Sequence, residues 1–411
     1  MQALVFDPSP ARLPLAGLAA RVGPGPALGP WSLLSLRRLP LPAPPAPGWV
    51  RLRVLTGGIC GSDVKQVLLQ AAADNPLSGL ISFPHVMGHE VVGRVEEPGQ
   101  GPKAGTLVVL DPWVGCRVRG EEPLCEACAR GFPPLCRHQP EGGPWGDGHG
   151  MHLGNIRGLP GGFAQRLWAH PSQCHVLPGG LPPRLGILAD PLAVALHAVE
   201  RAPVDGQGPV LILGAGTIGM ALTLAARRRW PARPTWVTAA WPHQLAPIAA
   251  LGAEALPASA RLVVPLVGRR TAAVSVSPWR GGPWLLGGGV ELVLDSIGSR
   301  QTTELALRCL APGGRIVVVG VAKPERTETT LAYYKEAEII GCNGYGLGQG
   351  SSGHLLDRAL EILEQRQAEL GAWVTHHFPL RAYRRAFRVA ARPGRYRAIK
   401  VGLDLAEEVG P

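Results

Sequence analysis

The pattern of hydrophobic and polar positions changes near residue 184, and this change divides the chain into two regions. Before it, short runs of alternating apolar residues, such as 49–55, are separated by many glycines and prolines. This pattern predicts a β-rich region with many loops. The proline-rich stretch 23–48 precedes the first clear strand, and we expect it to be an irregular lead-in.

After residue 184 the chain alternates segments with strand-like and helix-like periodicity. Strands are expected at 210–213, 236–239, 290–295 and 315–321, and helices at 191–201, 218–229, a segment ending near 252, and 354–368. This alternation predicts an α/β region with a parallel, doubly wound sheet. The stretch 265–289 is rich in glycine, proline and tryptophan and gives no firm assignment.

Composition agrees with a globular protein of two domains. The chain has 411 residues, of which 46% are hydrophobic and 17% charged. This length exceeds what one core usually supports, and the apolar content argues against disorder. The formal net charge of +11 is compatible with an anionic partner. However, the basic residues are scattered and lack an aromatic stacking motif, so we expect no nucleic-acid partner.

The N-terminal segment, the apolar runs and the cysteines indicate the cellular compartment. The N-terminus lacks a cationic start followed by an apolar segment, and no run approaches the roughly 20 apolar residues that span a bilayer. We therefore expect a cytoplasmic protein without a membrane partner. In a reducing compartment we do not expect the eight cysteines to form a disulfide framework. Their spacing is better interpreted as metal ligation or ordinary burial.

A glycine-rich segment, GAGTIG, lies between an apolar strand and an apolar helix. Glycines at 214, 216 and 219 permit a tight turn, a close approach of the backbone to a pyrophosphate, and close packing of helix on strand. The segment therefore predicts dinucleotide binding, with a simple tight turn as the alternative. The residues expected to contact the cofactor are Gly214, Gly216, Thr217, Ile218 and Gly219.

The choice between NAD and NADP stays open. An acidic residue that binds the adenosine ribose is expected about 20 residues after the glycine turn, but Ala239 and Ala240 occupy that stretch. Trp241 and His243 follow directly. They are candidates for contacts with the adenine or with a 2′-phosphate, and a solvated loop is the alternative.

Two glycine-flanked segments in the first region carry polar residues. GGICGSDVKQ places Cys60, Ser62 and Asp63 in one turn, and MGHEVVGRV places His89 and Glu90 in another. Alone, each is unremarkable, because single cysteines and histidines are usually buried or surface residues. Together they offer a thiolate, an imidazole and a carboxylate, which suit a catalytic zinc with an open position.

Asp190 is a further candidate ligand. It lies in LADPLAVALHAV, at the start of the helix expected between the two regions. The alternative is an acidic residue that complements the helix dipole.

Six motifs occur in order over nearly the whole chain, and with them the chain resembles the zinc-containing alcohol dehydrogenases of the medium-chain dehydrogenase/reductase family. The motifs are GGICGSD, GHEVVG, DPLAVALHAV, GAGTIG, DSIGS and APGGRIVVVG. The resemblance implies a GroES-like, β-rich catalytic domain over 1–185, completed by 341–411, and a Rossmann-type nucleotide-binding domain over 186–340. It also implies a catalytic zinc in the cleft between catalytic and nucleotide-binding domains.

The resemblance implies roles for the polar residues. Cys60, His89 and Asp190 would be the zinc ligands, with Glu90 beside the metal as an alternating ligand, and Asp63 would orient His89.

The proton relay is also implied by the resemblance. Ser62 would contact the substrate oxygen and pass its proton outward. Lys65 stands where the family often has a histidine that finishes the relay, and its part is open.

A second group of cysteines resembles the family's structural zinc site. Cys125, Cys128 and Cys136 have the family's spacing, but Cys116 is displaced, since eight residues separate it from Cys125 where the family has two. Four thiolates still suit tetrahedral zinc if the intervening loop bulges out. The alternative is that Cys116 takes no part.

The function implied is a zinc-dependent hydride transfer between an alcohol, or its carbonyl product, and NAD or NADP. The alternatives are a zinc-free reductase of quinones or enones and a non-catalytic nucleotide-binding relative. Primary and secondary alcohols, polyols and amino alcohols all remain possible substrates. The family also implies a homodimer or homotetramer.

Overall fold

The computed structural model describes residues 1–70, 75–202, 206–321, 326–348 and 353–406. The chain forms two compact units. Unit 1 contains Met1–Asp190 and Tyr345–Pro411, and unit 2 contains Pro191–Gly344. Each has its own sheet, and each is described by itself.

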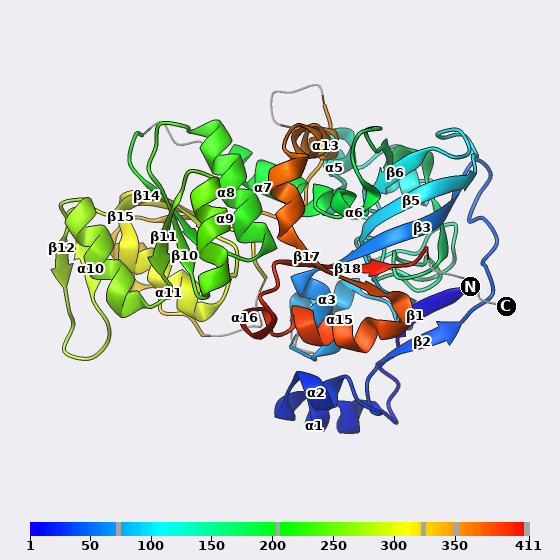
Figure 1. The fold of residues 1–411 in the computed structure, drawn as a ribbon, viewed down its shortest axis with the longest axis horizontal. Helices are drawn as coiled ribbons and strands as arrows, with labels where there is room; N and C mark the ends of the chain where they lie inside the picture. Colours follow the sequence, from blue (N-terminus) through cyan, green and yellow to red (C-terminus); the bar gives the residue numbers. More distant parts are fainter. Residues whose placement is uncertain (71–74, 203–205, 322–325, 349–352, 407–411) are drawn as a thin grey trace. The chain divides into compact units, whose positions relative to one another are not determined.

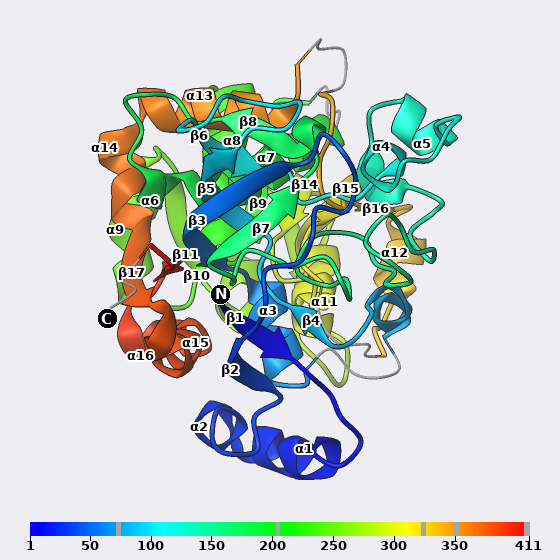
Figure 2. The same cartoon turned by 90° about the vertical axis from the view of Figure 1, so that its right-hand side faces the viewer.

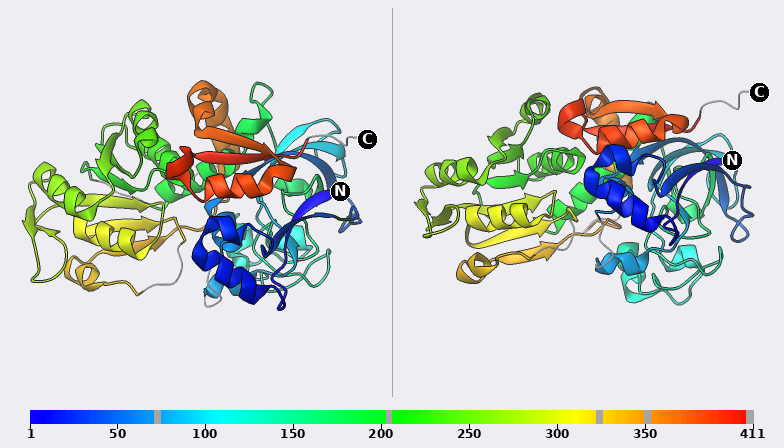
Figure 3. Two further views of the ribbon diagram at one scale, coloured as in Figure 1. Left: turned by 60° about the horizontal axis from the view of Figure 1, so that its bottom comes forward. Right: turned by 90° about the horizontal axis from the view of Figure 1, so that it is seen from below.

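Unit 1 is built on a seven-stranded sheet (Figure 2). The strand order is β17 (Val374–Pro379), β18 (Lys400–Asp404), β3 (Val50–Ile59), β5 (Glu90–Glu97), β6 (Leu107–Leu110) and β8 (Cys174–Val176), with β7 (Arg166–Ala169) paired to β3. Because β18 pairs antiparallel with β3, the C-terminal segment is part of the same sheet as the N-terminal region. Helix α15 (Tyr383–Ala390) packs on β17 and β18 (Figure 3).

The alternating pattern of β3 explains its place in the sheet. Val50, Leu52 and Val54 are fully buried, whereas Arg51 and Arg53 between them are not. Successive side chains of a strand point to opposite faces, so one face of β3 enters the core and the other stays partly in water. The predicted strand over 49–55 is thus confirmed and extends to Ile59.

The N-terminal region is more regular than the expected lead-in over 23–48. Strand β2 (Leu34–Arg38) pairs antiparallel with β1 (Gln2–Phe6), which also pairs with β4 (His85–Val86). Helices α1 (Leu13–Val22) and α2 (Pro24–Ala27) connect β1 to β2. Leu34 is buried in the unit 1 core and holds a short strand there. The expectation was wrong because the neighbouring prolines obscure the sequence pattern of this strand.

Unit 2 contains a six-stranded parallel sheet, as the alternating pattern predicted (Figure 1). Its order is β11 (Glu254–Pro257), β10 (Thr235–Ala239), β9 (Val210–Leu213), β14 (Val290–Asp295), β15 (Leu310–Val318) and β16 (Glu338–Gly341). Helix α8 (Thr217–Arg229) packs against β9 and β10, and α11 (Arg300–Cys309) packs against β14 and β15. The remaining helices of this sheet are α9 (Leu245–Ala250) and α10 (Ala260–Arg270).

The unassigned stretch 265–289 contains the end of α10 and an antiparallel hairpin. Strands β12 (Val274–Val276) and β13 (Trp284–Leu286) form the hairpin, and Leu285 is buried in the core with residues of α10. Pro265 lies inside the helix, where proline usually interrupts helical structure, which explains why the sequence pattern was ambiguous.

The remaining helices lie outside the sheets described above. They comprise α3 (Gly61–Val67), α4 (Cys116–Arg119), α5 (Glu126–Ala129), α6 (Pro183–Gly186), α7 (Ala189–Glu200), α12 (Thr330–Tyr334), α13 (Leu355–Gln365), α14 (Gln367–Leu370) and α16 (Pro393–Tyr396). Short 3-10 helices lie at Pro76–Leu80, Pro133–Leu135, Pro171–Gln173, Pro242–Gln244, Gly371–Trp373 and Leu380–Ala382. Within the described ranges, no helix has the length and apolar character needed to cross a membrane.

Candidate active site and metal centres

Cys60 is the N-cap of helix α3, so the segment expected to be a glycine-flanked turn begins a helix. The carboxylate of Asp63, in the first turn of this helix, accepts the Cys60 N–H at 2.9 Å. An acidic residue three positions after the N-cap satisfies a backbone donor that has no partner in the helix, so the sequence C-G-S-D starts a helix here. Ser62 is exposed in this first turn, and Lys65 is half-buried one turn later.

His89 lies directly before β5 and faces Asp63. Its Nδ1 is 3.6 Å from Oδ1 of Asp63, whose other oxygen accepts the Cys60 N–H. Potential ligand atoms of Cys60, His89 and Glu90 all lie within 4.8 Å of one another. Burial of His89 opposes its protonation, but Asp63, Cys60 and Asp190 together outweigh burial and raise the His89 pKa well above its usual range. The side chains are therefore arranged to stabilise positive charge.

Glu90 is paired with Lys400 of β18. The Lys400 Nζ donates to Oε2 of Glu90 and, at 3.3 Å, to the carbonyl oxygen of Ile59. Both charged side chains are 2% exposed, so each depends on the other for compensation of its charge. A Cβ at Gly58 would clash with the Glu90 carboxylate, so glycine is required beside the pair. Sequence reasoning missed Lys400, although a lysine in the apolar run 398–403 is a signal.

Asp190 is buried near the start of α7 and is held by Tyr345. The Tyr345 hydroxyl donates to Oδ1 of Asp190 at 2.8 Å. Burial, together with the charge of Glu90, raises the pKa of Asp190 to about 6 against the opposing charge of His89. Asp190 thus lies within electrostatic reach of both residues. Within the part of the chain that the structure describes, it is not in the 4.8 Å group formed by Cys60, His89 and Glu90.

His152, which was not identified from the sequence, packs against His89. The ring centroids are 4.8 Å apart. Its Nδ1 lies 2.6 Å from the carbonyl oxygen of Leu153, an acceptor that fixes the proton on Nδ1. Burial, together with the charge of His89, lowers the His152 pKa to about 3. The ring therefore stays neutral beside the protonated or metal-bound partner.

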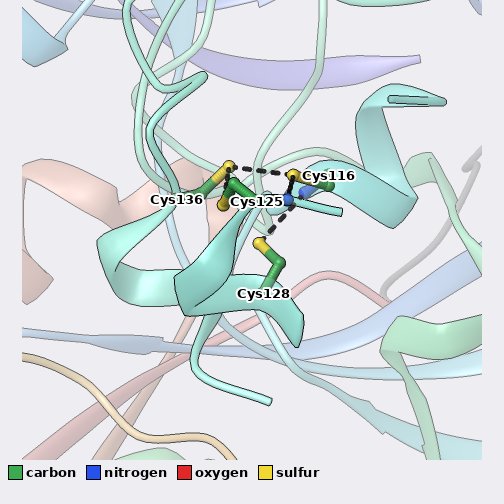
Figure 4. A group of neighbouring side chains, drawn as sticks. All are labelled: Cys116, Cys125, Cys128 and Cys136. Carbon is green, nitrogen blue, oxygen red and sulfur yellow. Dashed lines mark hydrogen bonds between the residues drawn. The ribbon is translucent and has the colours of Figure 1, made fainter. Parts of the chain in front are cut away.

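The four clustered cysteines come together, and Cys116 is among them (Figure 4). Its Sγ is 3.6 Å from that of Cys136, which is 4.0 Å from that of Cys125. Cys128 Sγ accepts the Cys116 N–H at 3.4 Å. Cys116 begins the short helix α4, which is capped by Gly120 with a φ of 75°, so part of the longer spacing is taken up by one helical turn. All four cysteines are free thiols.

The environment of the cluster suits thiolates bound to a cation. Burial raises the pKa of Cys136 to about 11. Burial also opposes ionisation of Cys125, but backbone hydrogen bonds from Arg137 and Cys128 lower its pKa to about 6. The guanidinium of Arg119 donates to the carbonyl oxygens of Glu141, Gly142 and Gly150 and so anchors the surrounding loop. Four converging thiols with no disulfide match a tetrahedral zinc.

The glycine turn of unit 2 has the geometry that nucleotide binding requires. Gly214 has a φ of +94°, which favours glycine, and a Cβ at Gly219 would clash with the Gly214 carbonyl oxygen. Gly216 is the N-cap of α8, and Thr217 and Ile218 begin the helix. The first N–H groups of a helix have no acceptor within it and carry positive dipole charge, so they can bind a pyrophosphate.

Gln244 connects this turn to the end of β10. Its Nε2 donates to the Ala215 carbonyl oxygen at 3.0 Å, and its Oε1 accepts the N–H groups of Ala240 at 3.0 Å and Trp241 at 3.1 Å. Trp241 is 44% exposed and His243 is half-buried on the same loop. Ala239, the last residue of β10, leaves the strand end without a carboxylate. Gln244 was not identified from the sequence.

Comparison with known proteins gives matches to both regions. Residues 46–179 match the family model described as an alcohol dehydrogenase GroES-like domain, and residues 218–361 match a zinc-binding dehydrogenase. L-idonate 5-dehydrogenase of Vitis vinifera is 29% identical over 363 residues, which are 87% of this chain and 88% of that protein. Sorbitol dehydrogenase of Arabidopsis thaliana is 28% identical with the same coverage.

Solved structures agree on the fold. The crystal structure of galactitol-1-phosphate dehydrogenase from Escherichia coli is similar with a TM-score of 0.70. The match covers 98% of this chain and 100% of that one, at 22% sequence identity. At this identity the match shows the fold alone.

Proposed function

The chain belongs to the zinc-containing, medium-chain alcohol dehydrogenase family, and we propose that it acts on a polyhydroxy compound at a zinc held by Cys60, His89 and Asp190. It is an oxidoreductase that transfers a hydride between an alcohol, or its carbonyl counterpart, and a nicotinamide cofactor. The substrate class rests on the relatives, since L-idonate and sorbitol both carry several hydroxyl groups. The proposed catalytic domain is 1–185 with 341–411, and the nucleotide domain is 186–340.

The convergence of Cys60, His89 and Glu90 within 4.8 Å is the observation that supports this site most strongly. A thiolate, an imidazole and carboxylates are the donors that zinc prefers. Zinc bound there would supply a Lewis acid for the substrate oxygen, and the nicotinamide would supply the acceptor for the hydride. Asp63, whose Oδ1 lies 3.6 Å from Nδ1 of His89, is proposed to orient His89 and to help set its charge through this ion pair.

Ser62 is proposed as the group that removes the substrate proton. Its hydroxyl can accept one proton while it donates another, and its exposed position in the first turn of α3 gives it access to solvent. Lys65, one turn further along the same helix, is proposed as the next group of the relay.

Glu90 is proposed as an alternating ligand that Lys400 restrains. The hydrogen bond from Lys400 holds the Glu90 carboxylate on one side. For Glu90 to bind a cation, its carboxylate must give up part of this ion pair. The strength of the ion pair with Lys400 therefore determines the free energy that Glu90 needs to become a ligand.

The four cysteines are proposed as the ligands of a structural zinc. The four thiols converge from α4, α5 and the loop that follows, and Arg119 holds that loop in place. Closure of such a site by four thiolates leaves no open position, which is typical of structural zinc.

The cofactor is NAD or NADP, and its proposed contacts are Gly214, Gly216, Thr217, Ile218 and Gly219 with the pyrophosphate. Trp241 and His243 are proposed to border the adenosine. Without a carboxylate at Ala239, a preference for NAD above about a hundredfold is not expected. We also propose a cytoplasmic homodimer or homotetramer.

A substrate panel tests the proposal. The kcat/KM values for polyols, simple primary and secondary alcohols and L-threonine are compared with both NAD and NADP. Highest activity with polyols supports the proposal. Reduction of quinones or enones without any alcohol oxidation would instead support a zinc-free reductase. An Ala239→Asp variant should shift the ratio toward NAD, whereas Ala232→Asp, in the exposed turn before β10, should not.

A further inference from the structure

A second group of metal-ligating side chains lies in unit 1 outside the sites described above. Potential ligand atoms of Asp111, His175 and His354 lie within 4.8 Å of one another. Asp111 follows β6, His175 is in β8, and His354 directly precedes α13. Because β6 pairs with β8 and places Val109 opposite His175, the sheet itself brings two of the three residues together.

His175 is held in the tautomer that a metal ligand requires. Its Nδ1 lies 2.6 Å from Oδ1 of Asp357, so the ring proton is on Nδ1 and the lone pair is on Nε2. This Nε2 is buried and has no hydrogen-bond partner in the described structure. Buried polar atoms are nearly always satisfied, so an unsatisfied imidazole nitrogen points to a ligand. A carboxylate behind a histidine is also the usual support of a metal-bound imidazole.

Asp111 supplies an anionic oxygen to the same place. The residue is 5% exposed, and its Oδ1 accepts the Trp113 N–H at 3.1 Å. Its Oδ2 is 3.4 Å from Nε2 of His354. The His354 ring lies 4.6 Å from the His175 ring, measured between centroids. A separation of 3.4 Å between two donor atoms matches ligands about 2 Å from one tetrahedral cation.

We propose that Asp111, His175 and His354 form a third metal site, which binds a divalent transition-metal cation of the zinc class. Two imidazoles and one carboxylate leave positions for water and contain no thiolate, so the site differs in chemistry from the four-cysteine cluster. The proposal is independent of the proposed substrate and of the catalytic residues. The bound cation would connect β6, β8 and the N-terminus of α13.

The capping bond of α13 limits the affinity of this site. His354 Nδ1 accepts the Leu356 N–H at 3.2 Å, so neutral His354 carries its proton on Nε2, toward Asp111. To bind a cation through Nε2, His354 must move this proton to Nδ1 and give up the capping bond. The third site is therefore expected to bind zinc more weakly than the cysteine cluster, and to load only when zinc is in excess.

The test is a comparison of metal content in the full-length protein. Wild type, His175→Ala and the control His376→Ala are dialysed to equilibrium against excess Zn²⁺, and bound zinc and alcohol oxidation are measured at that zinc concentration. Wild type and the control should retain about one zinc per chain more than His175→Ala. Alcohol oxidation should be unchanged in all three. Equal zinc content in wild type and His175→Ala would overturn the proposal.

A second variant distinguishes loss of the metal site from misfolding of His175→Ala. Asp357→Asn keeps all three ligands but weakens the support of His175, so the affinity of the third site should fall about 10- to 100-fold. Co²⁺ is titrated into protein that carries zinc only at the catalytic site and the cysteine cluster. Co²⁺ bound at the third site is recognised because its visible bands lack the intense thiolate absorption of a cysteine site. Identical Co²⁺ titrations for wild type and Asp357→Asn would show that the three residues form only a hydrogen-bonded group.

Discussion

Tyr345 donates a hydrogen bond of 2.8 Å from its hydroxyl to Oδ1 of Asp190. Both side chains are buried, and the bond joins the C-terminal part of unit 1 to the start of α7. A carboxylate fixed in this way presents a defined oxygen geometry to a cation, because its rotation would break a buried hydrogen bond. Tyr345 is therefore a positioning residue for the proposed catalytic zinc.

Removing the Tyr345 hydroxyl should weaken this zinc. Tyr345→Phe keeps the ring and its packing but leaves Asp190 without its donor, so we expect zinc affinity at the catalytic site to fall about 10- to 100-fold. Competition with a chelator measures the change. The control is Tyr383→Phe, which removes the hydroxyl of another buried tyrosine. Equal affinities in wild type and Tyr345→Phe would show that the bond has no positioning role.

Replacing Ser62 should slow the chemistry without loss of metal. Ser62→Ala removes a group that both donates and accepts a proton, so kcat should fall by about 10²-fold or more while zinc content and cofactor affinity stay unchanged. The measurement is kcat under conditions in which hydride transfer limits the rate. Ser62→Thr retains a hydroxyl and should recover most of the activity. A normal kcat in Ser62→Ala would refute the relay.

The cysteine cluster should hold one zinc. Cys128→Ser removes one of four thiolates, and the zinc that survives mild chelation should fall by about one equivalent per chain, with a lower unfolding temperature. Cys174→Ser is the matched control, because Cys174 lies outside the cluster. If Cys128→Ser kept the full zinc content, the structural assignment would be wrong.

His85 should make unit 1 sensitive to acid. Its Nδ1 lies 2.9 Å from the Ser82 carbonyl oxygen and its Nε2 lies 3.1 Å from the amide nitrogen of Gln66. The neutral ring therefore donates at Nδ1 and accepts at Nε2. Burial lowers its pKa from 6.5 to about 4. Since the unfolded chain binds the proton more readily, the stability contributed by neutral His85 is complete above pH 6.5 and is lost as the pH falls toward 4.

A variant isolates this contribution. His85→Asn keeps the donor toward Ser82 but cannot titrate, so it should remove up to about 3 kcal/mol of the difference in unfolding free energy between pH 7 and pH 4. Denaturant titrations at several pH values measure this difference. An unchanged dependence on pH would mean that the folded protein tolerates protonated His85.

The fold of unit 2 was largely predictable because its signals are local. A buried strand over 210–213, three spaced glycines and an apolar helix follow one another directly, so periodicity and turn chemistry sufficed. The strand at 34–38 was missed because its pairing with β1 depends on residues about 30 positions away. Helix α10 was likewise not predicted, because it contains Pro265 and proline usually interrupts a helix.

The candidate site was predictable only where its residues lie in short motifs. Cys60, Asp63 and His89 were identified from two such segments. Lys400 and Tyr345 were not, since they reach Glu90 and Asp190 from 310 and 155 positions away through the sheet topology. No local pattern encodes a contact of that separation, and the partners become visible only when β18 pairs with β3.

The most direct test of the account is the Cys60→Ala variant. Zinc content and the oxidation of a polyol panel with NAD and NADP are measured beside Cys342→Ala, which removes a buried cysteine outside both proposed zinc sites. We expect Cys60→Ala to lose about one zinc per chain and all measurable alcohol oxidation, while Cys342→Ala retains both. Full activity in a correctly folded Cys60→Ala protein would contradict zinc-dependent catalysis at this site.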